Sequence, residues 1–252
     1  MTAVCSTSVD RRRLGWEIAI VLALSLGQSA LYSVLSLLRA LLRPEALADQ
    51  ATALNPARAE EPAWDVVYRL LDIGFDLCLV ALVVYLLWEP GRSALRGIGL
   101  DLRSLPRDLG RAAILLVVIG VPGIALYVGA RLLGLNVDVQ ASSGIDGWLV
   151  PVLVLSALRA GLLEEVILGG YLFDRLGRVG WRPWTIILAV AGLRAAYHAY
   201  QGFGAIIGNF AMGVVFGWCY RRWGRVMPLV LAHALIDVFA FVGYPLVAPF
   251  LP

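Results

Sequence analysis

The uncharged stretch AAILLVVIGVPGIALYVGA, residues 112–130, decides the fold class of this chain. A run of about 20 apolar residues is the length that a helix needs to cross the hydrocarbon core of a bilayer. The whole chain of 252 residues has the same character, because 60% of its residues are hydrophobic and 15% are charged. Soluble domains are roughly 45–50% apolar and about 25% charged. The composition therefore excludes an ordinary soluble, disordered or disulfide-stapled chain and predicts a membrane protein.

Seven apolar segments predict an all-α, polytopic bundle of about seven transmembrane helices. The short alternating segments of a membrane β-barrel are missing from the sequence, so helices must satisfy the backbone in lipid. The predicted spans are residues 14–42, 66–88, 111–135, 148–168, 184–200, 203–220 and 226–244. The first span follows three arginines like a secretory signal, but it is too long to be one.

The segments between the spans divide the chain into two parts. Residues 1–140 hold spans one to three, with a linker-like external loop at 44–65 and a cytoplasmic loop at 89–110. The second loop is a candidate for a helix on the membrane surface. Residues 141–252 hold spans four to seven. No internal repeat typical of an inverted-repeat transporter is visible.

The placement of arginine predicts the orientation of the chain. Short cytoplasmic loops retain basic residues, whereas translocated loops carry few. With the amino terminus in the cytoplasm, most of the 21 basic residues fall on the cytoplasmic side. These are Arg11, Arg12, Arg13, Arg92, Arg96, Arg103, Arg107, Arg111, Arg175, Arg178, Arg182, Arg221, Arg222 and Arg225. We therefore expect a multi-pass protein of the cell membrane with a cytoplasmic amino terminus.

Ionisable residues inside the predicted spans are candidates for a functional site. Each charge at mid-bilayer costs about 2.5–3.5 kcal/mol on insertion scales, so its presence needs a reason. The set is Arg69, Asp72, Asp76, Arg159, Glu164, Glu165, Arg194, His198, His233 and Asp237. The chain has only two histidines, and both lie in spans near other ionisable groups. One such histidine is usually a core residue, but two of them beside a glutamate pair favour a site.

Helical spacing indicates which of these side chains can meet. His233 and Asp237 are one turn apart on one face, so the carboxylate can orient the imidazole. Glu164 and Glu165 differ by about 100° around their helix. We therefore expect one of them to face the reacting centre and the other a supporting partner, without both pointing at one spot. Two histidines and a glutamate can hold a catalytic zinc or activate a water directly, and the sequence leaves both open.

Glycines of the sixth predicted span recur at four-residue spacing. Gly204 and Gly208 form one such pair, and Gly213 and Gly217 form another. Small residues at this spacing allow two helices to approach closely in a membrane. We interpret them as packing positions.

Four motifs in order resemble one known family. The run EEVILGGYLFDRL, residues 164–176, is similar to the EExxxR motif of the CAAX-protease and bacteriocin-processing family. His198 stands where the FxxxH motif has its histidine. The glycine-rich stretch NFAMGVVFGWCYRR, residues 209–222, is followed by HALID, residues 233–237, which resembles the closing HxxxN or HxxxD motif. The resemblance covers about residues 147–244.

This resemblance implies an intramembrane endopeptidase that hydrolyses a peptide bond of a hydrophobic or membrane-anchored peptide. In that reading Glu164 activates a water, while His198 and His233 hold the water and stabilise the oxyanion. Asp237 supports His233, and Glu165 is a supporting acid. If zinc is used, its ligands are His198, His233 and Glu164; a metal-free glutamic mechanism is equally compatible with the family. The implied partners are the bilayer and the peptide, with no nucleic acid.

Two positions depart from the family motifs. Gly169 stands where EExxxR has arginine, and Arg194 stands where FxxxH has phenylalanine. We hypothesise that the two changes are linked, so that Arg194 supplies the missing guanidinium and pairs with Glu165. The competing interpretation is that Arg194 snorkels or pairs with Asp72 or Asp76.

Two other functions remain open from the sequence. Intramembrane Glu, His and Asp residues also relay protons or bind ions in transporters. A degenerate relative could bind a membrane partner or peptide, as an immunity protein does, without cutting it, and the loss of arginine at Gly169 is compatible with this. Hydrolysis is the function that the motifs favour.

Overall fold

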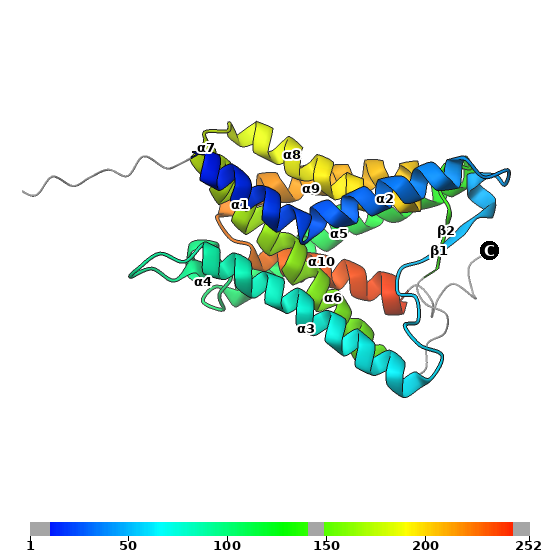
Figure 1. Cartoon of the computed structure of the whole chain (residues 1–252), viewed down its shortest axis with the longest axis horizontal. Helices are drawn as coiled ribbons and strands as arrows, with labels where there is room; N and C mark the ends of the chain where they lie inside the picture. The colour runs from blue at the N-terminus through cyan, green and yellow to red at the C-terminus, as the bar shows by residue number, and fades with distance from the viewer. Residues whose placement is uncertain (1–10, 141–148, 244–252) are drawn as a thin grey trace, which may run out of the picture.

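A computed structural model describes residues 11–140 and 149–243, which form one helical bundle (Figure 1). The ends of the fourth and seventh predicted spans, at 148 and 244, and the domain boundary at 141 lie outside the described residues. The α-helices are α1 (Arg11–Ala23), α2 (Leu26–Leu41), α3 (Pro62–Leu86), α4 (Ala94–Gly97), α5 (Leu105–Leu132), α6 (Val150–Glu165), α7 (Leu172–Val179), α8 (Pro183–Tyr197), α9 (Phe203–Trp223) and α10 (Met227–Val238).

Shorter elements complete the fold. Two 3-10 turns cover Leu47–Asp49 and Ala199–Gln201, and two π-helical segments cover Val166–Tyr171 and Phe239–Gly243. Strands β1 (Ala51–Ala53) and β2 (Asp138–Gln140) pair in parallel, with Thr52 opposite Val139. The all-α prediction is thus correct apart from this small sheet.

Proline and glycine set the helix boundaries. Helices α3, α5, α6, α8 and α10 each have a proline in their first turn, where the missing N–H has no helical partner to lose. Helix α7 ends at Gly180 and α9 ends at Gly224, both with positive φ, which is the usual glycine stop. These local signals are why the helices coincide closely with the apolar segments of the sequence.

Five segments differ from the prediction. The first predicted span is two helices, α1 and α2, that meet at an angle of 53°. The cytoplasmic loop contains only the four-residue helix α4, because α5 already begins at Leu105. The external loop contains β1, and α3 already begins at Pro62. The fourth and seventh spans continue from α-helix into π-helix, where the backbone gains an extra residue per turn.

Two described helices are long and apolar enough to cross a membrane by themselves. They are α5 and α9, and the bent pair α1 and α2 is a third when counted as one span. Helix α3 has sufficient length, but Asp65, Arg69, Asp72 and Asp76 interrupt its apolar sequence. Seven spans therefore remain a prediction, although the long helices alternate in direction along the bundle (Figure 1).

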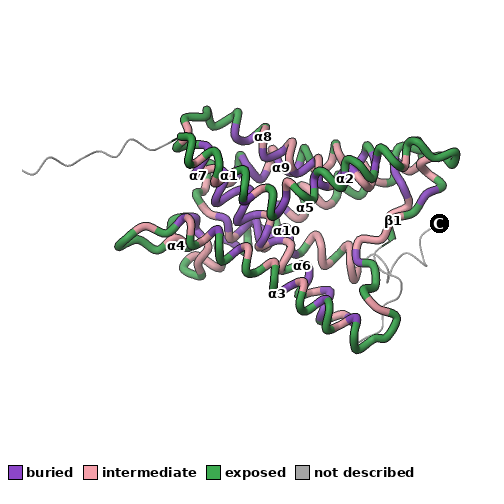
Figure 2. Tube along the Cα trace, in the orientation of Figure 1, coloured by how far each residue is buried: buried purple, intermediate pink, exposed green. Residues whose placement is uncertain are grey.

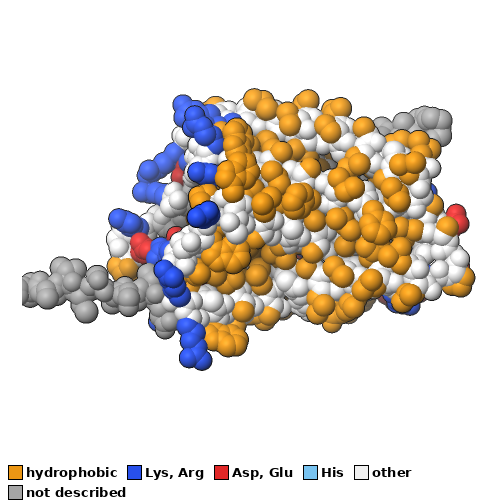
Figure 3. Space-filling view, turned by 90° about the horizontal axis from the view of Figure 1, so that it is seen from above, with side chains coloured by type: hydrophobic (Ala, Val, Ile, Leu, Met, Phe, Trp, Pro, Cys, Tyr) orange, Lys and Arg blue, Asp and Glu red, His pale blue; other side chains and the backbone are white. Residues whose placement is uncertain are grey.

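The outer surface of the bundle is apolar. Helix α5 exposes Ile114, Val117 and Val121, and Figure 3 shows hydrophobic side chains across the flank. Arginines gather at one end of that view, the end where α4, α7 and the start of α1 lie in Figure 1. We call this the arginine end, and the end with β1 and β2 the strand end. An apolar flank with arginine at one end is the distribution expected of a membrane protein.

The buried core lies around α6 and α10 (Figure 2). Helix α10 packs against α6 and α5, while α8 packs against α9 and α2. The predicted glycine packing is present in α9. A Cβ on Gly213 would lie 2.6 Å from the Cα of Ala191 in α8, and one on Gly204 would lie 2.5 Å from the Cβ of Ala130 in α5. These close approaches hold α9 against α8 and α5, while α10 packs against α6, at whose end the candidate site lies.

Candidate active site

Helix α6 ends in the centre of the bundle with two adjacent carboxylates, Glu164 and Glu165. Glu165 is 1% exposed, and the side chain of Glu164 is 14% exposed. Buried carboxylates are stable only with partners that compensate for their lost hydration. The partners here come from α8 and α10, so three helices build the site.

Arg194 of α8 joins the two carboxylates. Its Nη1 lies 3.3 Å from Glu164 Oε2, and its Nη2 donates to Glu165 Oε1. Its guanidinium also lies over the ring of Phe216, at 5.4 Å from the ring centre. The predicted pair of Arg194 with Glu165 is therefore present, and the side chain is 1% exposed.

The competing prediction, that Arg194 pairs with Asp72 or Asp76, is wrong. Asp76 pairs with Arg159 at 2.6 Å, and Asp72 pairs with Arg58 at 2.8 Å. Arg69 of the same helix pairs with Asp65 at 2.7 Å. The charged residues of α3 thus form ion pairs that do not include Arg194. None of the contacts to Glu164 or Glu165 described above comes from α3.

His233 of α10 lies between three carboxylates. Its Nδ1 is 2.7 Å from Glu165 Oε1, a hydrogen bond that fixes the ring. Its Nε2 is 3.8 Å from Glu164 Oε2 and 3.6 Å from Asp237 Oδ2. Because a carboxylate oxygen can only accept from Nδ1–H, the neutral ring presents a free Nε2 to Glu164 and Asp237.

This arrangement corrects two expectations. Glu164, Glu165 and His233 each offer an atom within 4.8 Å of the others, so both carboxylates do reach one spot. Although Glu164 and Glu165 leave the helix about 100° apart, their side chains are long enough for both to reach Arg194 and His233. The group that orients His233 at hydrogen-bonding distance is Glu165, whereas Asp237 lies beside the opposite nitrogen.

His198 lies at the carboxyl end of α8. Its Nδ1 is 3.1 Å from the carbonyl oxygen of Arg194, so that nitrogen carries the proton and Nε2 is free. Within residues 11–140 and 149–243, its only hydrogen bond is the one to Arg194, so its approach to the other site residues is less close than that of His233.

Tyr197 belongs to the site although the motifs do not include it. Its hydroxyl donates to Glu164 Oε2, and its ring lies 4.6 Å from that of His198. A buried tyrosine hydroxyl needs a polar partner, so a tyrosine next to a motif histidine in an apolar helix was the available signal.

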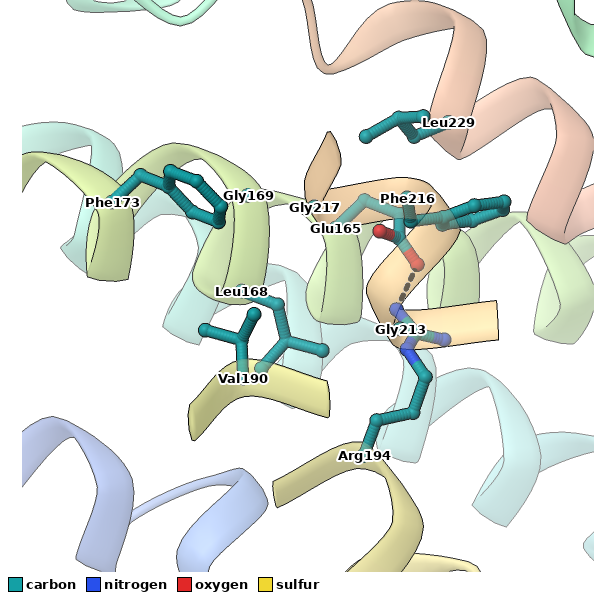
Figure 4. Close-up of a pocket in the computed structure, with 10 residues that line it drawn as sticks. All are labelled: Glu165, Leu168, Gly169, Phe173, Val190, Arg194, Gly213, Phe216, Gly217 and Leu229. Carbon is teal, nitrogen blue, oxygen red and sulfur yellow. Dashed lines mark hydrogen bonds and ion pairs between the residues drawn. The ribbon is translucent and has the colours of Figure 1, made fainter. Parts of the chain in front are cut away.

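Gly169 lies beside a small void in this core. Figure 4 shows Gly169, Glu165 and Arg194 around it, together with Phe216 and Leu229. The void measures about 10 Å³, close to the minimum for one water molecule. A Cβ on Gly169 would make only ordinary contacts, the nearest at 3.6 Å from Val226. The guanidinium absent from this helix therefore leaves space, and Arg194 approaches the space from α8.

A zinc site needs donor atoms of suitable type that are free to bind the metal. Two imidazole nitrogens and a carboxylate are suitable ligand types. The three donor atoms that converge, however, belong to Glu164, Glu165 and His233, so His198 is not part of this set. In addition, Glu165 Oε1 already accepts from Arg194 and His233, and Glu164 Oε2 accepts from Tyr197 and Arg194. A divalent cation would have to enter beside the guanidinium, so the set fits zinc poorly.

Comparison with known families agrees with the motifs. Residues 146–239 match the family described as Rce1-like, type II CAAX prenyl endopeptidase Rce1-like. The resemblance to the CAAX-protease and bacteriocin-processing family is thereby confirmed for this segment, which holds α6 to α10. Comparisons with curated proteins and with solved structures find no match.

Proposed function

We propose that this Rce1-like chain is an intramembrane endopeptidase that hydrolyses a hydrophobic or membrane-anchored peptide. The observation that carries the proposal is the meeting of Glu164 with His233 inside an apolar bundle, on the segment that matches the family. A charge-rich centre of this kind is costly to build in a membrane protein, and it is what acid–base catalysis requires.

The gap between Glu164 and His233 suits one catalytic water. At 3.8 Å, Glu164 Oε2 and His233 Nε2 are too far apart for a direct hydrogen bond. A water between them can donate one hydrogen to each of these acceptors. Asp237 Oδ2, 3.6 Å from the same nitrogen, borders this position.

Glu164 acts as the general base in this mechanism. It takes a proton from the water as the water oxygen attacks the peptide carbonyl carbon, and the carbonyl oxygen becomes an oxyanion. His198 and His233 flank that oxygen and stabilise it in their protonated forms, in which Nε2 carries a hydrogen to donate. Glu164 then passes the proton to the leaving nitrogen, the carbon–nitrogen bond breaks, and a carboxylic acid and an amine result.

Glu165 and Arg194 position the catalytic groups. Glu165 fixes the ring of His233 through Nδ1, and Arg194 holds Glu165 and Glu164 at the spacing seen here. Because the guanidinium already occupies the carboxylate oxygens that would bind a metal, we propose the metal-free version of the mechanism. Cleavage should then survive 1,10-phenanthroline, and its loss with recovery on added zinc would contradict this version.

The distribution of surface charge supports the remaining parts of the proposal. The arginine end carries the segments that were assigned to the cytoplasm, and the apolar flank fits a multi-pass protein of the cell membrane (Figure 3). The proposed catalytic part is residues 141–252, and residues 1–140 supply the first three spans. The bilayer and the peptide are the proposed partners.

A cleavage assay tests the enzyme directly. Purified protein in detergent is incubated with a pool of membrane-tethered peptides, and products are identified by mass spectrometry. The parent protein and Asp72→Asn should cleave, whereas Glu164→Gln should not. Asp72 is a matched control because its surface ion pair with Arg58 lies outside the site. Equal cleavage by Glu164→Gln, or none by the folded parent, would refute the proposal.

A further inference from the structure

A second cavity opens at the strand end of the bundle. It lies between α2, residues 50–52, and the tyrosines Tyr197 and Tyr200, and it has a volume of about 430 Å³. Ligand sites typically occupy 300–1,000 Å³, so the cleft is large enough for part of a peptide. We call it the α2 cleft.

A polar stripe of α2 lines this cleft. The stripe consists of Ser29, Ser33, Ser36 and Arg39, at helical spacings of three and four residues, and Arg43 lines the same cleft just beyond the last residue of α2. The other faces of α2 expose Leu31, Leu35 and Leu38. Serine and arginine on one face of an otherwise apolar helix are costly against lipid, so this face is expected to border water or a polar ligand.

The α2 cleft reaches the candidate active site through Tyr197. This side chain lines the cleft, and its hydroxyl donates to Glu164 Oε2. Its ring also contacts that of His198. At the other side of the cleft, the amide of Tyr200 donates to Ser33 Oγ at 2.8 Å, which ties α2 to the end of α8. A ligand in the cleft is therefore separated from Glu164 by one side chain.

The charge of the cleft is positive. Arg43 has a weak contact with Gln50 at 3.4 Å, and in the described part of the chain Arg39 has no acidic partner at ion-pair distance. The nearby acids Glu45 and Asp49 do not line the cleft. The two guanidinium groups that line the cleft are suited to a carboxylate, which they can bind through charge-assisted hydrogen bonds.

The strand in the cleft wall favours an extended ligand. Asp138 N–H donates to Gln50 O, and Leu54 N–H donates to Gln140 O, so the even-numbered residues of this segment bond to β2. The backbone groups of Ala51 and Ala53 therefore point away from β2, because alternate residues of a strand face opposite edges. An extended peptide can add to such an edge by main-chain hydrogen bonds.

We infer that the α2 cleft binds an extended acidic segment of the peptide substrate, with a carboxylate on Arg39 and Arg43. This rests on the proposed endopeptidase activity and names its substrate class. The peptide would approach from the strand end, lie along β1 and bring its scissile bond past Tyr197 to Glu164.

Binding can be measured without cleavage by using the Glu164→Gln variant in phosphatidylcholine nanodiscs. The probes are two pools of fluorescent, palmitoylated peptides, one rich in Asp and Glu with a free carboxylate, the other with Asn and Gln and an amide. We expect the acidic pool to bind about tenfold more tightly. Adding Arg39→Gln and Arg43→Gln should abolish this preference, whereas Arg58→Gln, at an exposed surface pair, should leave it unchanged.

The strand edge has its own test in Ala51→Pro. Gln50 has an extended backbone, which a following proline requires, and the Ala51 N–H is not part of the ladder with β2. We expect weaker binding of both pools with an unchanged unfolding temperature. Unchanged binding would exclude the strand edge as the peptide contact.

The outcomes separate this inference from the proposed function. Equal affinity for the two pools, an acidic preference that survives loss of both arginines, or arginine-dependent binding of phosphatidylglycerol instead of peptide would each overturn the inference. If the parent protein nevertheless cleaves peptides, the endopeptidase proposal stands. If the acidic pool binds through the arginines and the parent cleaves nothing, the cleft is supported and the endopeptidase proposal fails.

Discussion

Replacing Arg194 by phenylalanine should destabilise the bundle, and replacing Gly169 by arginine in the same chain should reverse much of the damage. Arg194 and Glu165 are each 1% exposed, and removal of one partner from a buried ion pair typically costs about 3–5 kcal/mol. His233 still donates to Glu165 after the change, so we expect the lower part of that range, about 3 kcal/mol.

The second substitution, Gly169→Arg, places a guanidinium near Glu165 again, from the opposite side of the small void beside Gly169. Gly169 and Glu165 both line that void and lie about one turn apart on the same helix. A Cβ at position 169 would cause no steric clash, because it would lie 3.6 Å from Val226 and 3.7 Å from Tyr220, which are ordinary van der Waals distances. The double variant should be less destabilised and cleave faster than Arg194→Phe alone.

The assay is reversible unfolding in mixed micelles, followed by tryptophan fluorescence, with cleavage rates measured in parallel. Arg58→Phe is the matched control, since its pair with Asp72 is about half exposed and should contribute less than about 1 kcal/mol. If the double variant is as damaged as Arg194→Phe alone, or if the single variant is fully stable, the exchange of arginines is wrong.

Two further predictions concern packing, and one concerns metal. Gly213→Val should lower the free energy of unfolding by about 1–3 kcal/mol, because its Cβ would lie 2.6 Å from the backbone of α8, while Gly192→Val faces open space and serves as the control. Gly99→Ala should cost more than Gly134→Ala in the same measurement: both have positive φ, but only the Cβ at Gly99 would overlap the turn between α9 and α10. Metal analysis of active protein should find less than one zinc per chain, and a stoichiometric zinc that is lost together with activity would contradict the metal-free mechanism.

The helices could be predicted from the sequence because apolar runs, prolines and glycines act locally. The start of α8 at Pro183 and the end of α9 at Gly224 follow from single residues. The bend between α1 and α2 and the π-helical segment after Glu165 could not be predicted, because the glycines near them, Gly27, Gly169 and Gly170, are also frequent inside regular membrane helices. Both depend on how neighbouring helices pack, which a pattern along one helix does not contain.

The composition of the site could be predicted more fully than its contacts. The rarity of charge in the spans identified Glu164, Glu165, Arg194 and His233, and the motif departures predicted the pair between Arg194 and Glu165. The reach of the two glutamates was misjudged, because the angle between positions on a helix ignores the length of the side chains. Tyr197 was missed because tyrosine is common in apolar helices, and only its hydrogen bond to Glu164 distinguishes it.

The most direct test of the central claim is a double-variant cycle on single-turnover cleavage. The claim is that Glu164 and His233 act on one water. Glu164→Gln and His233→Gln should each slow cleavage by about 10²–10⁴-fold, in proteins whose unfolding transitions match the parent. Because groups that act as a unit are strongly non-additive, the double variant should be no slower than the slower single variant. Effects that multiply in the double variant would show that the two residues act independently, and would contradict the claim.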